Sequence, residues 1–211
     1  MREFREYELT GDVKKRQESE YWKSIEFSLF HKVAVSYYPS YVEEEAIHAV
    51  DETIPVKAIT AYVYEEFLQN LNKDFAKREG LLFVGGFAHP PNADAVLWFA
   101  KEVFPKIREQ IKVNFYIVGS KVTDEIKALE QPGNGIIVKG FVSEEELADL
   151  YRNCRIVVVP LRYGAGVKGK VVEAIYNGAP IVTTSVGSEG IPDVEKFSSS
   201  RISRTNLPRQ S

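Results

Sequence analysis

Two patterns of apolar residues take turns along most of the chain. Short continuous apolar runs that end in turn residues are typical of buried strands, whereas apolar residues three and four positions apart are typical of helices. From Gly80 to Thr184 the two patterns alternate with short connections. This alternation predicts a parallel sheet with helices on both faces, which is a Rossmann-like, doubly wound α/β domain.

Five strands are predicted in this region, at residues 81–86, 113–119, 135–138, 156–161 and 179–184. The helices predicted between them cover residues 90–111, 125–129, 143–154 and 171–176. The clearest of these helices starts with a capping box, in which Ser143 is followed three positions later by Glu146. Its apolar positions end at Cys154. No strand pattern follows Gly190, so the sixth strand expected in such a domain is absent from the prediction.

The first 62 residues carry less of this alternation. Asp12 is expected to cap a helix that runs to about Lys32. Its expected buried face is formed by Trp22, Ile25, Leu29 and Phe30. Strands at 33–38 and 56–62 flank a helix at 41–50, whose first turn holds three glutamates where the helix dipole favours acids. Two strands and two helices are too few for an independent doubly wound domain, so this part is interpreted as the tail end of a second α/β domain.

The predicted organisation therefore has four parts. Residues 1–62 are the remnant of a second domain, and residues 63–79 are a partly helical linker. Residues 80–191 form an incomplete Rossmann-like domain. Residues 192–211, with three serines in a row and few large apolar residues, are interpreted as a disordered tail. Both ends look cut from a longer chain.

Composition and charge exclude several classes of protein. The chain has 211 residues, of which 44% are hydrophobic and 27% charged, so it can bury a core. A net charge of −3 gives no sign of a nucleic-acid partner. No apolar run approaches the ~20 residues of a membrane-spanning helix. No apolar segment of a signal peptide follows Met1.

The few cysteines and histidines narrow the chemistry. Cys154 is the single cysteine and cannot form an internal disulfide, which favours a reduced, cytoplasmic protein. The three histidines lie far apart, so no metal site is predicted. Phe67, Leu71 and Trp98 are expected to cover surface that further parts of a longer chain would bury, which leaves self-association open.

The strongest candidate site is the loop between the fourth strand of the domain and the following helix. Gly164, Gly166 and Gly169 lie within six residues, which is more glycine than a turn requires. Glycines let the backbone approach a ligand closely, and free N–H groups at a helix start point at an anion. With Lys168 and Lys170 beside them, these residues predict a phosphate site.

Two other glycine turns are expected at the same edge of the sheet. Gly85-Gly86 follows the first strand of the domain and Gly119-Ser120 follows the second. Ligands of doubly wound sheets bind at the carboxyl ends of the strands, where all three glycine segments are expected to meet. Turn geometry alone accounts for Gly119 equally well.

Two familiar nucleotide motifs are excluded. A P-loop has Ser or Thr directly after its Gly-Lys, whereas Val171 follows Lys170. The glycines at 164, 166 and 169 have the spacing of the dinucleotide fingerprint, but they follow the fourth strand of the domain and not its first.

Glu173, one turn into the helix after the loop, has two interpretations. The first is a surface pair with Lys170, which contributes about 0.2–0.5 kcal/mol. The second is a carboxylate that accepts hydrogen bonds from two ribose hydroxyls, each contributing about 1.5–3 kcal/mol. One substitution at Glu173 separates them, because only the second predicts a large loss of nucleotide binding.

The segment from Gly164 to Ile191 resembles the donor-binding half of GT-B glycosyltransferases, in the retaining group 1 class (family 4). The resemblance rests on the glycine loop, on Glu173, and on the later positions Asn177, Gly178, Pro180, Gly187, Glu189 and Gly190. Three earlier segments fit the same domain in the same order, namely Phe83-x-Gly85, Pro91-Asn92 and Gly140-Phe141-Val142. The resemblance covers about residues 80–191, and residues 30–62 look like the end of the acceptor-side domain.

The resemblance implies a role for each matching residue. Glu173 matches the second acid of the family's Glu-x7-Glu element, which holds the nucleotide ribose. The loop from Gly164, above all the N–H groups of Gly166 and Val167 with Lys168 or Lys170, matches the diphosphate cradle. Gly85 and Gly86 match the glycine turn near the phosphates and the acceptor. Backbone around Phe141 and Val142 would hold the base.

The sequence departs from the family pattern at two places. The first acid of the Glu-x7-Glu element falls at Ala165, which has no carboxylate to contact the transferred sugar. A basic residue that the family often carries shortly after the glycine turn is also missing, since residues 87–92 contain His89 but no Lys or Arg.

The implied activity is retaining transfer of a sugar from a nucleoside-diphosphate donor to a hydroxyl of a sugar or glycan acceptor, in polysaccharide or glycan biosynthesis. Lys168 and Lys170 would act as catalytic residues by stabilising the charge of the departing diphosphate. No cofactor is expected besides the donor, which is a substrate. Two alternatives stay open: a non-catalytic nucleotide-sugar-binding module, which Ala165 favours, and a sugar-nucleotide epimerase. The residues do not distinguish UDP, GDP and dTDP.

Overall fold

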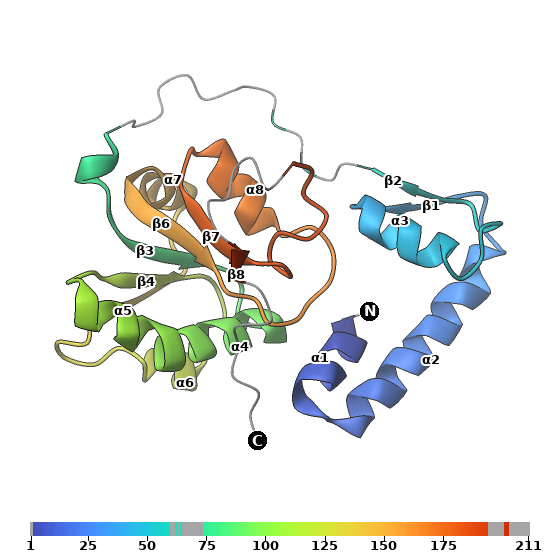
Figure 1. The fold of residues 1–211 in the computed structure, drawn as a ribbon, viewed down its shortest axis with the longest axis horizontal. Coiled ribbons are helices and arrows are strands. Elements are labelled where there is room, and N and C mark those ends of the chain that lie inside the picture. Colours follow the sequence, from blue (N-terminus) through green and yellow to red (C-terminus); the bar gives the residue numbers. More distant parts are fainter. Residues whose placement is uncertain (1, 60–61, 63, 65–73, 194–200, 203–211) are drawn as a thin grey trace.

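The chain contains a large and a small parallel sheet (Figure 1). The structure is a computed structural model that describes residues 2–59, 62, 64, 74–193 and 201–202. The large sheet has six strands and the small sheet has two. The predicted Rossmann-like, parallel α/β sheet is confirmed, and the N-terminal part adds a two-stranded parallel sheet.

The large sheet has the order β5-β4-β3-β6-β7-β8, and all its neighbouring strands are parallel. Its strands are β3 (Glu79–Val84), β4 (Phe115–Val118), β5 (Ile136–Gly140), β6 (Cys154–Val159), β7 (Ile181–Thr184) and β8 (Arg201–Ile202). Numbered from β3, this is the 3-2-1-4-5-6 order of dinucleotide-binding folds. The direction of winding reverses between β3 and β6, where Leu82 pairs with Tyr116 on one side and Val157 on the other.

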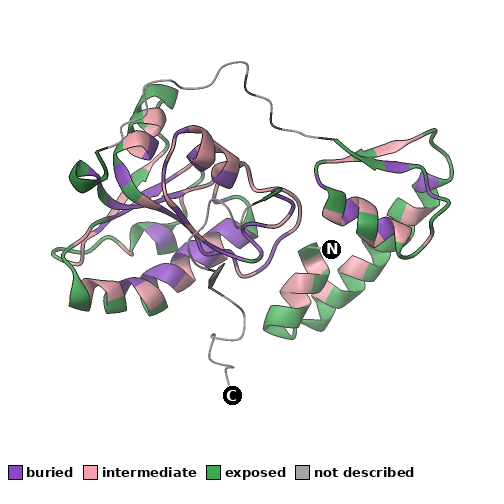
Figure 2. Cartoon of the chain, turned by 45° about the horizontal axis from the view of Figure 1, so that its top comes forward, coloured by how far each residue is buried: buried purple, intermediate pink, exposed green. Residues whose placement is uncertain are grey.

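Helices cover both faces of this sheet (Figure 1). They are α4 (Pro90–Trp98), the π-helical segment η2 (Phe99–Val103), α5 (Phe104–Gln110), α6 (Asp124–Lys127), α7 (Glu144–Asn153) and α8 (Gly169–Tyr176). The core lies between the central strands and the inner sides of these helices (Figure 2). Leu82, Phe83 and Val157 in the sheet and Val171 and Ala174 of α8 are fully buried.

The single helix predicted over residues 90–111 is interrupted by a π-helical turn. Pro105 has no N–H group, so it cannot continue the ladder of hydrogen bonds. The N–H of Phe104 donates instead to the carbonyl of Phe99, five residues earlier. This turn directs both Phe99 and Phe104 onto Phe115 in the core.

The capping box of α7 is half formed. The Ser143 hydroxyl accepts the N–H of Glu146 at 3.2 Å, as predicted, but the Glu146 carboxylate pairs with Lys139. The helix ends at Asn153, and Cys154 begins β6 and is buried. Burial raises the pKa of the Cys154 thiol to about 12.

The strand β8 corrects the expectation that no strand follows Gly190. Thr183 and Thr184 pair in register with Arg201 and Ile202. A short edge strand pairs through backbone groups alone, so it needs no apolar pattern that the sequence could reveal. The remaining predicted tail residues, 194–200 and 203–211, lie outside the described residues.

The N-terminal part consists of α1 (Arg2–Thr10), α2 (Val13–Phe30), β1 (Ser36–Tyr38), α3 (Tyr41–His48) and β2 (Val56–Ala58). Asp12 caps α2 as predicted, since its carboxylate accepts the N–H of Lys14 at 3.0 Å. A small core contains Phe30, Ile47, Ile54 and Val56.

Two expectations for the N-terminal part were wrong. The helix α1 was not predicted, because its apolar residues are sparse and none of its residues is buried. Trp22 and Leu29 were expected to be buried, yet they are 57% and 50% exposed, because only the end of α2 reaches the small core.

The linker is described only in part. Of its apolar residues, Phe67, Leu68 and Leu71 lie outside the described residues, and Phe75 is exposed in the 3-10 turn η1 (Phe75–Lys77). Trp98, expected at the surface, packs partly buried beside Arg162. Among the helices of the described ranges, none has the length and hydrophobicity to cross a bilayer.

Candidate functional site

The candidate site lies at the carboxyl ends of β3 and β6, the two strands between which the winding reverses. Gly85 follows β3, and a Cβ atom placed on it would lie 2.8 Å from the Nζ of Lys170 and 2.9 Å from the side chain of Asn92. Gly86 lies next to Ser120, whose Oγ would be 3.4 Å from such an atom. The structure therefore brings together the three glycine segments that the sequence predicts at this edge.

Gly119 has a geometric role. A Cβ atom on Gly119 would lie 1.9 Å from the carbonyl oxygen of Gly85, so only glycine allows the turns after β3 and β4 to approach so closely. The N–H of Gly119 donates to the carbonyl of Gly140 at 2.8 Å. Of its two interpretations, turn geometry accounts for this residue.

The loop between β6 and α8 is fixed at its start and has two glycines with positive φ. Arg162 donates to Asp94 on α4 at 2.9 Å through Nε, and its second bond to the same carboxylate is shorter. Gly164 has φ 140° and Gly166 has φ 73°, backbone conformations that residues with a side chain rarely adopt. The loop then enters α8 at Gly169, with free backbone N–H groups at the helix start.

Lys170 lies in the site but does not pair with Glu173. Its Nζ donates to Oδ1 of Asn92 at 2.6 Å and lies 4.3 Å from the ring centroid of Phe83. Asn92 is held in turn by the carbonyl of Gly86 at 2.9 Å. Burial, and then the charge of Lys168, lower the pKa of Lys170 to about 7.

Lys168 contributes a second cation. Its Nζ donates to the carbonyl of Gly166 and lies 3.9 Å from the carboxylate of Glu189. Burial lowers the pKa of Lys168 to about 8, although Glu189 opposes this shift. Two partly desolvated ammonium groups beside a glycine-rich loop form a site that attracts an anion.

Glu173 is partly buried on α8 and faces Tyr151 of α7. The Tyr151 hydroxyl donates to Oε2 of Glu173 at 3.0 Å. Burial and then the charge of Glu173 raise the pKa of Tyr151, so the hydroxyl stays a donor. Three residues further along α8, the ring of Tyr176 stacks on Tyr64 with centroids 3.9 Å apart.

Phe141 and Val142, the predicted base-binding residues, follow β5 at the same edge of the sheet. Phe141 is 82% exposed and Val142 packs partly against the core. Val167 packs against the segment after β7, since a Cβ atom on Gly190 would be 3.0 Å from its Cγ2.

Sequence reasoning missed residues that the N-terminal part brings to the loop. Arg5 of α1 donates to the carbonyl of Gly164 at 2.6 Å and to both carboxylate oxygens of Glu189, at 2.5 and 2.6 Å. Glu43 of α3 accepts the N–H of Gly166 at 2.8 Å. Figure 1 shows α1 and α3 on the side of the large sheet where the loop before α8 lies. No local signal marks such contacts, because their partners are more than 100 residues apart in the chain.

Ala165 has no carboxylate, and two acids from elsewhere in the chain, Glu43 and Glu189, reach the loop nearby. The Arg5 guanidinium links Glu189 to the backbone of Gly164. Glu189 was part of the sequence motif, but nothing in the sequence alone indicated that it lies beside the loop and pairs with Arg5.

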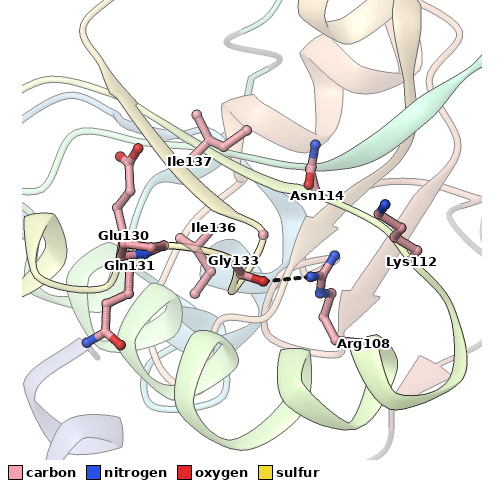
Figure 3. Close-up of a pocket in the computed structure, with 10 residues that line it drawn as sticks. Arg108, Lys112, Asn114, Glu130, Gln131, Gly133, Ile136 and Ile137 are labelled. Carbon is pink, nitrogen blue, oxygen red and sulfur yellow. Dashed lines mark hydrogen bonds between the residues drawn. The ribbon is translucent and has the colours of Figure 1, made fainter.

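A second cleft lies at the opposite edge of the sheet, at the amino ends of β4 and β5. It measures about 540 Å³ and contains Arg108, Lys112 and Glu130 (Figure 3). Arg108 donates to the carbonyl of Val113 at 3.0 Å and to that of Gly133 at 2.9 Å. These bonds satisfy the guanidinium by fastening the loop before β5, so Arg108 has a structural role.

The described geometry defines a Rossmann-like domain with an anion-attracting loop at its winding reversal. Residues 78–199 match the model of the family described as glycosyl transferases group 1, and the chain belongs to this family. A relative from Klebsiella pneumoniae, named "Uncharacterized 44.6 kDa protein in cps region", is 33% identical over 136 residues. The match covers 61% of this chain and 33% of that protein, so the chain spans about a third of its relative.

Solved structures share the fold. Sucrose-phosphate synthase from Thermosynechococcus elongatus has a TM-score of 0.66 at 19% identity, over 89% of this chain and 49% of that one. A mutant of S. aureus TarM, solved in complex with UDP among other ligands, has a TM-score of 0.60 at 17% identity, over 76% of this chain and 32% of that one. Pneumococcal O-GlcNAc transferase GtfA, in complex with UDP and GlcNAc, has a TM-score of 0.54 at 20% identity, over 75% and 32%.

Proposed function

We propose that this chain is the donor-binding part of a retaining GT-B glycosyltransferase, which transfers a sugar from a nucleoside diphosphate to a hydroxyl of a sugar or glycan acceptor. Family membership and the fold support this proposal. The observation that carries it is the loop before α8, where the positive-φ glycines Gly164 and Gly166 lie beside the buried ammonium groups of Lys168 and Lys170. Glu173 lies one turn further along the same helix.

In the proposed complex the donor extends along the loop and the start of α8. The diphosphate lies on the backbone N–H groups of Gly166 and Val167, near the two lysines. Glu173 accepts hydrogen bonds from the ribose hydroxyls, chiefly through Oε1, since Oε2 already accepts the Tyr151 hydroxyl. The base reaches the backbone near Phe141, and the turn at Gly85 and Gly86 faces the phosphates and the acceptor.

The proposed chemistry is electrostatic. When the bond from the sugar to the diphosphate breaks, negative charge builds up on the leaving phosphate oxygens. Lys168, Lys170 and the N–H groups at the start of α8 would stabilise that charge in a site that water reaches poorly. No protein nucleophile is needed for this contribution. We extend the proposal to polysaccharide or glycan biosynthesis on the sequence resemblance.

Ala165 supports one alternative, a module that binds nucleotide sugar without transferring it. The carboxylate that the family pattern places there is absent, and Glu189 is engaged by Arg5. Sugar transfer after an acceptor-side domain is supplied would decide for the enzyme. An epimerised donor would instead indicate a sugar-nucleotide epimerase.

The test is calorimetric titration with UDP, GDP and dTDP. UDP comes first, since solved structures of this fold, among them TarM and GtfA, hold it. We expect one nucleotide to bind and Glu173→Ala to weaken that binding by roughly 100-fold, because two charged hydrogen bonds are lost.

Glu145→Ala is the matched control, because Glu145 is an exposed acid on α7. It should leave the affinity unchanged. If no nucleotide binds to the folded chain, either as the wild type or as a variant that frees the N–H of Gly166, the proposed donor site is contradicted.

A further inference from the structure

Glu43 of α3 reaches from the N-terminal part into the candidate anion site. Its Oε1 accepts the N–H of Gly166 at 2.8 Å, and its Oε2 accepts the hydroxyl of Ser40. The residue is only 7% exposed. A glutamate in the first turn of a short helix is usually solvated, so its burial on the glycine loop is unexpected.

The surroundings of Glu43 are those of a bound anion. Besides the N–H of Gly166, its charge acts on Arg5 and Lys168 and favours the protonated form of both. The carboxylate therefore occupies a position with a backbone donor and two cations close by. This combination is typical of sites that hold phosphate groups.

The backbone just before Glu43 packs tightly against Gly190, which in turn lies next to Val167 of the glycine loop. A Cβ atom on Gly190 would lie 2.6 Å from the Cβ of Ser40, so the start of α3 is in close contact with the segment after β7. Ser40 itself is 2% exposed. Glu43 is thus held on the loop by packing as well as by its hydrogen bonds.

We propose that Glu43 is a built-in competitor for the anion site of the glycine loop. One N–H group cannot serve two anions, and a carboxylate at that distance repels a phosphate. A diphosphate therefore binds only after α3 and Glu43 leave Gly166. The apparent affinity is the intrinsic affinity multiplied by the fraction of molecules in which Glu43 has left Gly166. The inference rests on the proposed function, because it takes the ligand to be a diphosphate.

The experiment compares Glu43→Ala and Glu43→Gln with the wild type, using inorganic diphosphate, UDP, GDP and dTDP as probes. Alanine removes both the charge and the acceptor, so we expect binding to become about tenfold tighter or more. Glutamine keeps an acceptor but removes the charge, so its effect should be smaller and in the same direction. Glu45→Ala, an exposed acid of the same helix, is the matched control and should change nothing.

Hydrogen exchange at the Gly166 amide tests the contact itself. The amide should exchange slowly in the wild type, faster in Glu43→Ala, and slowly again in Glu43→Ala with diphosphate bound. Circular dichroism confirms that each variant is folded, and Glu43→Gln keeps the size of the side chain if alanine disturbs the packing.

The outcomes separate the two proposals. Equal or weaker binding by folded Glu43→Ala and Glu43→Gln, relative to a wild type that binds, overturns the inference and leaves the donor site intact. Absence of binding by every variant contradicts the donor site, and the inference with it. Tighter binding by both variants, with faster exchange at Gly166, supports both.

Discussion

The hydroxyl of Tyr151 donates a hydrogen bond of 3.0 Å to the carboxylate of Glu173, and so joins α7 to α8 at the candidate ribose position. The bond uses one oxygen of the carboxylate and orients the other. Because Tyr151 is only 1% exposed, the orientation is set by the core. We therefore expect Tyr151→Phe to weaken nucleotide binding about two- to tenfold, through the loss of a bond worth roughly 0.5–1.5 kcal/mol.

Calorimetric titration of the nucleotide that the wild type binds measures this effect. Tyr176→Phe is the matched control, because it removes a hydroxyl from α8 and keeps the ring that stacks on Tyr64. An unchanged affinity in folded Tyr151→Phe would show that Glu173 needs no orientation, or that it does not contact the ligand.

Much of the large domain could be predicted because its signals are local. Apolar runs identified the positions of β3 to β7 to within a few residues, and the glycine loop was correctly placed between a strand and a helix. The errors have physical causes. Pro105 changed the hydrogen-bond ladder of one helix, and β8 pairs through its backbone without an apolar pattern.

For the candidate site, the sequence predicted the three glycine segments that meet there, but not the side-chain contacts between distant segments. The sequence placed Gly166, Lys168 and Lys170 together, since they are neighbours in the chain. One of its two interpretations paired Lys170 with Glu173, whereas the structure pairs Lys170 with Asn92 across 78 residues. Such contacts depend on how the strands order in the sheet, which local periodicity does not determine.

Gly119 provides a test of the close approach between the turns after β3 and β4. A side chain there would place its Cβ 1.9 Å from the carbonyl oxygen of Gly85, and backbone cannot move away at low cost. We expect Gly119→Ala to lower the free energy of unfolding by about 3 kcal/mol or more, in the range of the largest point-mutation effects. Urea denaturation followed by circular dichroism measures it.

Gly133→Ala separates this clash from simple backbone strain. Gly133 also has a positive φ, 79°, but no atom lies within 4 Å of the position of its Cβ. Its substitution should therefore cost only the strain of a left-handed alanine, about 1–2 kcal/mol. Equal losses for the two variants would contradict the close approach at Gly119.

The lowered pKa of Lys170 predicts how anion binding depends on pH. With a pKa of about 7, Lys170 loses its charge as the pH rises from 6.5 to 9. Above about pH 7 the charge of the ligand changes little, because the second ionisation of a phosphate group, with a pKa of about 6, is then nearly complete. A diphosphate binds the protonated lysine better, so its affinity should fall on the order of tenfold over this interval.

Two measurements check this dependence. Titrations at pH 7.5 in buffers with different heats of ionisation should show that binding takes up protons. Lys170→Arg keeps its charge at every pH, so its affinity should vary less with pH, with the remaining dependence due to Lys168, whose pKa is about 8. A wild-type affinity that stays constant from pH 6.5 to 9 would exclude Lys170 from the anion site.

The pair of Arg5 and Glu189 tests whether α1 is fastened to the loop before α8. The two side chains share two hydrogen bonds, of 2.5 and 2.6 Å, and are 19% and 14% exposed. A partly buried, bidentate pair is screened less by solvent than a surface pair. A double-mutant cycle with Arg5→Ala and Glu189→Gln, measured by urea unfolding, should therefore give a coupling energy of about 1 kcal/mol or more.

The pair of Arg16 and Glu20, at i and i+4 on α2 and more than half exposed, is the matched control and should couple less. Equal coupling in the two cycles would mean that α1 does not hold the loop in solution.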